Sequence, residues 1–276
     1  MKGYCSLQKE KLHSQITPRF FAGADVGASR TKTAILDEKK KLVGFHVKKS
    51  GTDFEKSADD CLSASLEMAG LSKKEICHAI STGYGRKNVS YALSHRTEIG
   101  CHAKGCFHYF PFAITIIDIG GQDNKVIKLN DKGQRTGFKM NRKCSAGTGA
   151  FLEEMSPRLD IPLEEMNALA EKSREMVRLG SFCTVFSATE VLENIRNGKK
   201  IEDIVKGLFF SVIKRVTEMD TFTDQVVMTG GVVAHNRHLV KMTEEMVNKT
   251  VLVPPHPQLT GAVGAALYAM EEADCT

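Results

Sequence analysis

Two stretches of this sequence decide its fold: residues 20–49, FFAGADVGASRTKTAILDEKKKLVGFHVKK, and residues 113–129, AITIIDIGGQDNKVIKL. In each, an apolar strand runs into Asp-x-Gly, a polar turn follows, and a second strand begins a few residues later. The first stretch continues through a charged turn into a third strand. The repetition predicts two similar halves, the first of which opens on a β-meander.

Helical patterns surround these strands. Apolar residues recur with helical spacing at about 54–69, 150–159, 163–179, 188–196, 201–219 and 261–270, and further short strands are predicted at 77–81 and 225–228. Strands therefore alternate with helices, which is typical of an α/β protein. Because no long linker separates the halves, we expect two packed lobes with a ligand cleft between them.

Composition and charge exclude several classes of protein. Of 276 residues, 42% are hydrophobic, and 38 basic against 33 acidic residues give a net charge of only +5. These values exclude a disordered chain and do not indicate a nucleic-acid partner. The longest nearly apolar stretch, residues 110–117, is far shorter than the ~20 residues of a membrane helix. The first twenty residues lack an export signal, so we expect a cytoplasmic protein.

The two Asp-x-Gly turns, at residues 25–27 and 118–120, have the composition of phosphate-binding hairpins. Glycine lets backbone N–H groups approach phosphate, and an aspartate at a strand end can hold hydrated Mg²⁺ and orient a water molecule. Hydroxyls and a positive charge follow the first turn, at Ser29, Thr31 and Lys32. A third strand leads into Thr-Gly-Gly at 229–231, whereas neither GxxxxGKS nor GxGxxG occurs. The pattern predicts a nucleotide held between the hairpins.

Two of the eight cysteines, Cys144 and Cys183, each precede a predicted amphipathic helix. The free N–H groups and dipole of a helix start favour a thiolate or an anionic cluster. A 4Fe-4S cluster usually takes four thiolates, which two copies of the chain would supply across a two-fold axis. Burial of both cysteines in the core is the alternative. Cys101-His102 with Cys106 and His108 imitates a zinc site, but we do not expect metal there.

Eight segments resemble one family: ADVGASRTK (24–32), STGYGR (81–86), TEIGCHAKG (97–105), IDIGGQDNKVI (117–127), KMNRKCSAGTGAFLE (139–153), SFCTVFSATEV (181–191), VVMTGGVVAHN (226–236) and HPQLTGAVGAALYA (256–269). Over about residues 20–270 the chain is similar to the ATPase activators of 2-hydroxyacyl-CoA dehydratases, the ATPase subunits of benzoyl-CoA reductase and the reductases of double-cubane cluster proteins. The resemblance implies the actin, hexokinase and acetate kinase fold, with two RNase H-like lobes around ATP.

The resemblance also assigns residues. It implies a first phosphate loop at Asp25, Gly27, Ala28, Ser29, Arg30, Thr31 and Lys32, and a second at Asp118, Gly120, Gly121, Gln122, Asp123 and Lys125. Gly147 and Gly149 would face the phosphates, and Gly230, Gly231 and Gln258 would flank adenosine. Asp25, Asp118 and Gln122 are the expected catalytic residues, and Asp118 is the expected metal-binding or water-orienting carboxylate. The segment CHAKG would lie on a helix beneath the cleft.

The implied cofactors are ATP, Mg²⁺ and one 4Fe-4S cluster that bridges a homodimer through Cys144 and Cys183. The implied activity is oxygen-sensitive, ATP-driven transfer of single low-potential electrons. The donor would be a reduced ferredoxin or flavodoxin, and the acceptor a separate iron-sulfur dehydratase or reductase.

The expected division of the chain is an extension at 1–19, a first lobe at 20–112 with the helix 261–276 packed back on it, and a second lobe with the cluster-binding helices at 113–260. Two alternatives remain open at this point. One is a sugar or acyl kinase of the same fold without a cluster. The other is a nucleotide-gated binding module without redox chemistry.

Overall fold

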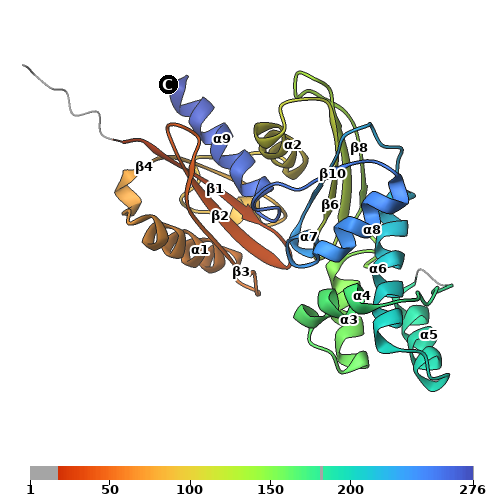
Figure 1. Cartoon of the computed structure of the whole chain (residues 1–276). Helices are drawn as coiled ribbons and strands as arrows, with labels where there is room; N and C mark the ends of the chain where they lie inside the picture. The colour runs from red at the N-terminus through yellow and green to blue at the C-terminus, as the bar shows by residue number, and fades with distance from the viewer. Residues whose placement is uncertain (1–17, 181–182, 276) are drawn as a thin grey trace, which may run out of the picture.

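The computed structural model describes residues 18–180 and 183–275, which form two five-stranded sheets with helices around them (Figure 1). The expected extension at 1–19 therefore lies almost wholly outside the described residues, as do 181–182 and the last residue of the expected C-terminal helix. The first sheet has the order β3-β2-β1-β4-β5, and the second has the order β10-β9-β6-β7-β8.

The two sheets share one topology. The first consists of β1 (Phe20–Val26), β2 (Arg30–Asp37), β3 (Leu42–Lys49), β4 (Ile76–Thr82) and β5 (Ser94–His95). The second consists of β6 (Ile114–Ile119), β7 (Asn124–Leu129), β8 (Arg135–Asn141), β9 (Val226–Thr229) and β10 (Val251–Leu252). In each, three antiparallel strands are followed by two that run parallel to the first of them. The predicted repetition and the α/β class are confirmed.

Helices cover both faces of the first sheet. On one face, α1 (Phe54–Ala69) buries Leu62 and Leu66 against Ala22 and Ile35. On the other face lies α9 (Thr260–Asp274), which approaches β1 so closely that a Cβ on Gly23 would lie 2.0 Å from the carbonyl oxygen of Ala262. The chain's last described helix therefore packs on its first strand.

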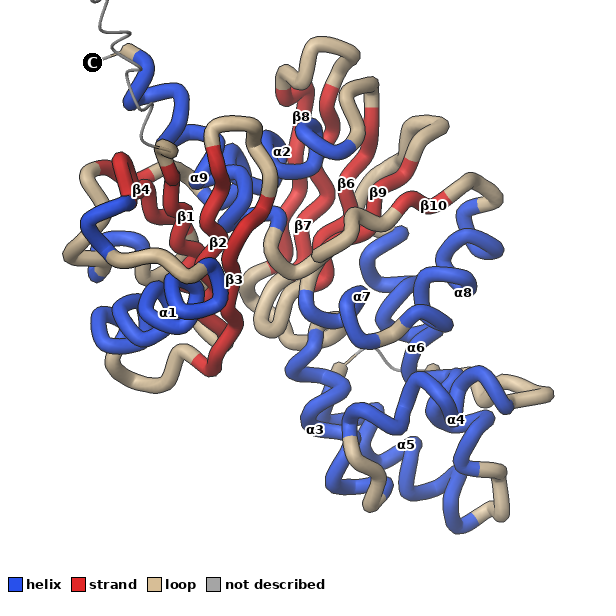
Figure 2. The backbone as a smooth tube through the Cα atoms, turned by 60° about the vertical axis from the view of Figure 1, so that its left-hand side comes forward, coloured by secondary structure: helices blue, strands red, loops and turns tan. Residues whose placement is uncertain are grey.

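The helix α2 (Glu98–Tyr109) lies between the two sheets (Figure 2). Its Cys101 joins the apolar cluster of α9 and β4, while Ile99, Ala103 and Cys106 pack against Ile114 and other residues of the second sheet. The CHAKG segment is thus helical, as expected, and it belongs to the element that contacts both halves.

The other face of the second sheet is covered by α6 (Ile201–Thr217). The remaining helices are α3 (Gly149–Leu159), α4 (Met166–Lys172), α5 (Thr184–Arg196), α7 (Gly231–His235) and α8 (Arg237–Val247), of which α3, α4 and α5 extend away from the sheet (Figure 1). Single 3₁₀ turns occur at Lys73–Glu75, Arg86–Asn88 and Leu163–Glu165. The core of this half forms where α6, with Phe209 fully buried, packs against Ile117, Ile119 and Val126 of the sheet. Within 18–180 and 183–275, no helix has the length and apolarity that a membrane crossing requires.

The predicted helix at 163–179 is wrong beyond Lys172. The helix ends there because Asp203, on α6, binds the residues that follow Lys172. Its Oδ1 accepts hydrogen bonds from Ser173 Oγ at 2.7 Å and from the Glu175 amide at 3.1 Å. The Asp203 carbonyl also accepts from the Val177 amide at 3.1 Å. Residues 173–178 therefore run along α6 without helical hydrogen bonds of their own.

Candidate nucleotide site and cysteine pair

The two halves place an aspartate and a lysine opposite each other in the same register. Asp25 pairs with Lys32 across β1 and β2, and Asp118 pairs with Lys125 across β6 and β7. The ammonium of Lys32 lies 3.0 Å from Asp25, and that of Lys125 lies 3.2 Å from Asp118. The sequence repeat has therefore become a repeated ion pair at the carboxyl end of each central strand.

A glycine with positive φ stands beside each pair. Gly83 (φ +88°) follows β4, and a Cβ there would lie 2.6 Å from both Asp25 Oδ1 and the carbonyl oxygen of Val26. Gly230 (φ +101°) follows β9, and a Cβ there would lie 2.2 Å from the carbonyl oxygen of Ile119. Both the backbone conformation and the close approach exclude a side chain at these positions. The neighbouring strand thus turns tightly past each carboxylate.

Asp25 is 1% exposed and incompletely satisfied. Its Oδ2 accepts from Lys32, but its Oδ1 is buried without a hydrogen-bond partner. Burial alone would lower the pKa of Lys32, but the charge and hydrogen bond of Asp25 raise it above its ordinary value. A buried carboxylate oxygen without a donor is costly unless a ligand satisfies it. Asp25 Oδ1 is therefore suited to receive a cation or its water.

The second pair belongs to a larger ionic cluster around Lys125, whose side chain is 1% exposed. Its ammonium lies 2.7 Å from Asp123, 2.9 Å from Glu98 and 3.2 Å from Asp118. Burial alone would lower the pKa of Lys125, but these three carboxylates raise it well above its ordinary value. Lys125 therefore holds the second loop together and is not free to reach a phosphate.

Asp118 is held ionised by its surroundings. Burial alone would raise its pKa, but His102, Lys125 and a 2.9 Å hydrogen bond from Thr229 hold that pKa well below its ordinary value.

The two ion pairs together contain more carboxylates than lysines. Four carboxylates, those of Asp25, Asp118, Asp123 and Glu98, surround two lysines. The excess of negative charge and the orphaned oxygen of Asp25 fit Mg²⁺, which takes one or two carboxylates and fills its shell with water and phosphate.

The two glycine loops touch. A Cβ on Gly121 would lie 2.8 Å from Ser29 Oγ, so the predicted phosphate loops meet at the junction of the two halves. The first loop is closed by a hydrogen bond from Gly27 N–H to the Arg30 carbonyl, and Ser50 Oγ braces it by donating to the Gly27 carbonyl at 2.6 Å. Ala28, Arg30 and Gln122 are exposed on these loops.

The second loop also caps α3. The Gly120 and Gly121 carbonyls accept hydrogen bonds from the amides of Gly149 and Ala150, at 2.9 and 2.8 Å. Asn124 donates to the Gly147 carbonyl at 2.7 Å, while its own Oδ1 is buried without a partner. The structure thus brings the predicted phosphate-facing glycines against the second loop.

The residues predicted to flank adenosine also come together. The amide of Gly230 donates to the Pro257 carbonyl at 2.9 Å, which places Gln258 beside the turn between β9 and α7. Gly231 begins α7, and a Cβ there would meet no atom within 4 Å. This side of the turn is therefore open.

The cysteine segments lie side by side. The hydroxyls of Ser145 and Thr184, the residues directly after Cys144 and Cys183, are 3.1 Å apart. Cys144 is half-buried, and Cys183 is exposed at the N-cap position of α5. Cys144 departs from the prediction, because it precedes α3 by a loop and lies outside the first turn, where the dipole acts. The two thiols offer two ligands per chain, so two chains are needed for a four-thiolate cluster.

Two of the remaining cysteines, Cys101 and Cys106, are buried on α2. Burial raises the pKa of Cys101 to about 12 and that of Cys106 well above its ordinary value, so both stay protonated thiols. Over residues 18–180 and 183–275, no group of three or more His, Cys, Asp or Glu is arranged to hold a metal ion. His102 instead faces the carboxylates of Asp118 and Glu98, a placement that the spacing of His and Cys in the sequence does not indicate.

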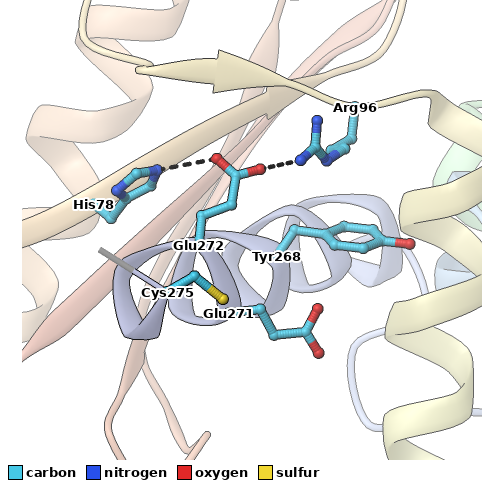
Figure 3. A pocket seen from close by; sticks show the side chains of 6 residues that line it. All are labelled: His78, Arg96, Tyr268, Glu271, Glu272 and Cys275. Atoms are coloured by element: carbon cyan, nitrogen blue, oxygen red, sulfur yellow. Dashed lines mark hydrogen bonds and ion pairs between the residues drawn. The ribbon is translucent and has the colours of Figure 1, made fainter.

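A surface pocket of about 480 Å³ lies at the far end of α9 from Gly261 (Figure 3). It is lined by His78, Arg96, Tyr268, Glu271, Glu272 and Cys275. Glu272 accepts a hydrogen bond from Ser94 at 2.9 Å and is ion-paired with Arg96. This pocket contains none of the predicted site residues.

The family model of the BadF/BadG/BcrA/BcrD ATPases matches residues 22–269. The chain belongs to this ATPase family. It is 43% identical to the activator of lactoyl-CoA dehydratase from Anaerotignum propionicum, over 91% of this chain and 97% of that protein. Members of the BadF/BadG/BcrA/BcrD family thus include named dehydratase activators closely similar to this chain.

Solved structures agree with this placement. The activator of 2-hydroxyisocaproyl-CoA dehydratase from Clostridium difficile, solved with bound ADPNP, has a TM-score of 0.87 and 39% identity, with 92% of this chain and 96% of that chain covered. A glucokinase from Streptomyces griseus, with a TM-score of 0.57 and 11% identity over 91% of this chain and 99% of that one, shows the fold alone. The expected actin and hexokinase fold is confirmed.

Proposed function

We propose that the protein is a homodimeric ATPase that delivers single low-potential electrons to an iron-sulfur dehydratase or reductase. A 4Fe-4S cluster shared by two copies of the chain, through Cys144 and Cys183 of each, would carry the electron. The observation that carries this proposal is the path from the second glycine loop through the amides of α3 to the cysteine pair. One short segment thereby joins the nucleotide loops to the cluster ligands.

ATP would bind between the two glycine loops, with its adenosine toward Gly230, Gly231 and Gln258. When bound, Mg²⁺ would supply charge neutralisation on the phosphates. Asp25 Oδ1 and Asp118 are the carboxylates that would hold it or its water. The ammonium of Lys32 is ion-paired with Asp25, and the Lys32 side chain is one-fifth exposed, so the ammonium can also meet a phosphate. Gln122, exposed on the second loop, would orient the attacking water.

Binding and hydrolysis would act on the cluster through Gly121. Because Gly121 lies against the Ser29 side chain, a phosphate group that enters between the loops would displace this side chain or move the two loops apart. The carbonyl of Gly121 holds the start of α3, and the loop before α3 carries Cys144. Loss of the γ-phosphate would therefore shift the cysteine segments, a population shift between two dimer geometries.

The partners follow from this reaction. A reduced ferredoxin or flavodoxin would give one electron to the cluster, and a separate iron-sulfur enzyme would accept it while ATP is hydrolysed to ADP and phosphate. The similar proteins that are named activators of dehydratases support a dehydratase as the acceptor. We also propose that the protein is cytoplasmic. We further propose that its lobes comprise residues 20–112 with 261–276, and residues 113–260; the packing of α9 on the first sheet supports this division.

The test is anaerobic purification followed by iron, sulfide and EPR measurements. About four irons per dimer, or about two per chain, are expected, because the cluster is shared. The EPR spectrum of the reduced protein should differ between ATP and ADP. Iron-free protein that phosphorylates a sugar or acyl substrate would instead support a kinase. Identical spectra with ATP, ADP and no nucleotide, together with partner reduction that needs no ATP, would contradict the proposal.

A further inference from the structure

His102 lies among the carboxylates of both halves. It is 5% exposed, on the helix that contacts both sheets. Its Nδ1 is 3.8 Å from Asp118 Oδ1 and its Nε2 is 3.9 Å from Glu98 Oε1. The point where a Cβ of Gly261 would lie is 3.2 Å from His102 Nε2 and 3.0 Å from Asp25 Oδ2. The imidazole therefore faces Asp118, at the end of β6, directly, and Asp25, at the end of β1, across Gly261 at the start of α9.

The ring is tied to α9. His102 Nδ1 lies within hydrogen-bonding distance, 3.1 Å, of Thr260 Oγ1 at the start of that helix. The two helices pack backbone to backbone, since a Cβ on Gly105 would lie 2.0 Å from the Thr260 carbonyl oxygen and one on Gly264 would lie 1.8 Å from that of Cys101. Such packing leaves α2 little freedom to slide along α9.

The same helix, α9, packs against β1 through Gly23, and β1 carries Asp25. The contacts from His102 to Thr260, and from α9 to β1, therefore fix the position of the imidazole relative to the first sheet. Asp118, the carboxylate that Nδ1 faces, belongs to the second sheet. His102 thus stands where a shift of one half against the other would change the spacing of the two carboxylates.

We propose that His102 is a positioning residue for ATP hydrolysis, which sets Asp118 of the second sheet at a fixed spacing from Asp25 of the first. The proposal rests on hydrolysis at these two carboxylates, which is the nucleotide part of the proposed function, and is independent of the cluster. The ring nitrogen Nδ1 faces both Thr260, at the start of the helix packed on β1, and Asp118 of the second sheet, whereas an apolar side chain of similar size fills the space without either contact. Small errors in the placement of catalytic groups slow turnover more than they weaken binding.

The experiment compares His102→Leu, which keeps the volume, with His102→Asn, whose amide can keep the contact with Thr260. Thr260→Val removes the same hydrogen bond from the other side. Ile99→Ala, a buried change one turn earlier on α2 that faces the second sheet's apolar core, is the matched control. The readouts are kcat for ATP, the Mg²⁺ concentration that gives half-maximal turnover, the Kd for ATP in EDTA and the Tm.

His102→Leu should lower kcat by about tenfold or more and raise the half-maximal Mg²⁺ concentration, while the Kd for ATP in EDTA stays within about twofold. His102→Asn should recover most of kcat, and Thr260→Val should fall between them. If His102→Leu and Thr260→Val turn over ATP as Ile99→Ala does, or if Asn is no better than Leu at equal Tm, the inference is wrong. A wild-type protein without ATPase activity would instead contradict the proposed function. If His102→Leu does not fold, the comparison of kcat between His102→Asn and Thr260→Val still tests the proposal, because His102→Asn is expected to have the higher kcat.

Discussion

The hydroxyl oxygens of Ser145 and Thr184 lie 3.1 Å apart, each one residue beyond a cysteine. These residues are 39 positions apart in the chain, so the contact exists only because α3 and α5 pack together. It sets the loop before α3 against the start of α5. Two thiols on adjacent, hydrogen-bonded segments can bind the same metal cluster, which two thiols in separate parts of a core cannot.

Replacing either Cys144 or Cys183 with Ser should therefore remove the cluster and leave the ATP site intact. Iron per chain should fall from about two towards zero in both variants, because a shared four-thiolate site that loses two ligands per dimer is not retained. Cys77→Ser, a change at an exposed cysteine on β4, is the control and should keep its iron. Nucleotide binding should be equal in all three. Full iron in the Cys144 or Cys183 variant would exclude that residue as a ligand.

Asp25→Asn and Asp118→Asn should each lower ATP turnover by about 100-fold or more, while the Kd for ATP rises much less. The amide keeps the size of the side chain but removes the charge that organises the cation around the reacting phosphate. Steady-state hydrolysis at saturating Mg²⁺ and equilibrium binding of ATP measure the two effects separately. Asp37→Asn, at the far end of β2, is a suitable control. Wild-type turnover in either variant would remove that aspartate from the site.

Much of this site could be predicted from the sequence, because its repeated Asp-x-Gly turns lie at strand ends, where register follows from short hairpins. His102 and Glu98 could not, since both lie on a helix and reach the carboxylates only through packing that no local pattern records. The edge strand β8 was missed for a related reason: Arg135–Asn141 is mostly polar and half-exposed, without the apolar alternation that marks β6. Asp203 likewise ends the helix at Lys172 through contacts made 30 residues away.

Lys125→Met should destabilise the protein by about 3 to 5 kcal/mol, because it leaves three carboxylates around a buried position without their cation. Lys32→Met should cost less, since Lys32 has one carboxylate partner and is partly exposed. Urea unfolding at neutral pH measures both. Equal losses in the two variants would contradict the central role of Lys125.

The Lys125→Met and Lys32→Met variants should also differ in their stability at low pH. The pKa of Asp118 is lowered in the folded protein, so its contribution to stability is complete above its unfolded value, about 4, and is lost as the pH falls below that towards the folded value. Without Lys125 the folded pKa of Asp118 rises, which shrinks this contribution and moves its loss to higher pH. The acid-unfolding midpoint of Lys125→Met should therefore exceed that of wild type, and that of Lys32→Met should change less. An unchanged midpoint in Lys125→Met would contradict this account of Asp118.

Gly149→Val should separate nucleotide binding from the response of the cluster. A Cβ at Gly149 would lie 3.2 Å from the Gly121 Cα and 3.3 Å from Val232, so a branched side chain pushes the second loop away from the start of α3. The hydrogen bonds from Gly149 and Ala150 to that loop, at 2.9 and 2.8 Å, should lengthen or break. The second loop and the segment that carries Cys144 then no longer move together, although both cysteines and both aspartates remain.

The measurement is the EPR spectrum and reduction potential of the reduced dimer with ATP and with ADP. In wild type the two nucleotides should give different signals, whereas in Gly149→Val the difference should shrink while iron stays at about two per chain. Gly137→Val is the matched control, because a Cβ at Gly137 on the edge strand β8 would meet nothing within 4 Å. If Gly149→Val keeps the wild-type difference with its iron intact, the coupling does not run through the start of α3, and the loops must reach the cluster by another part of the fold.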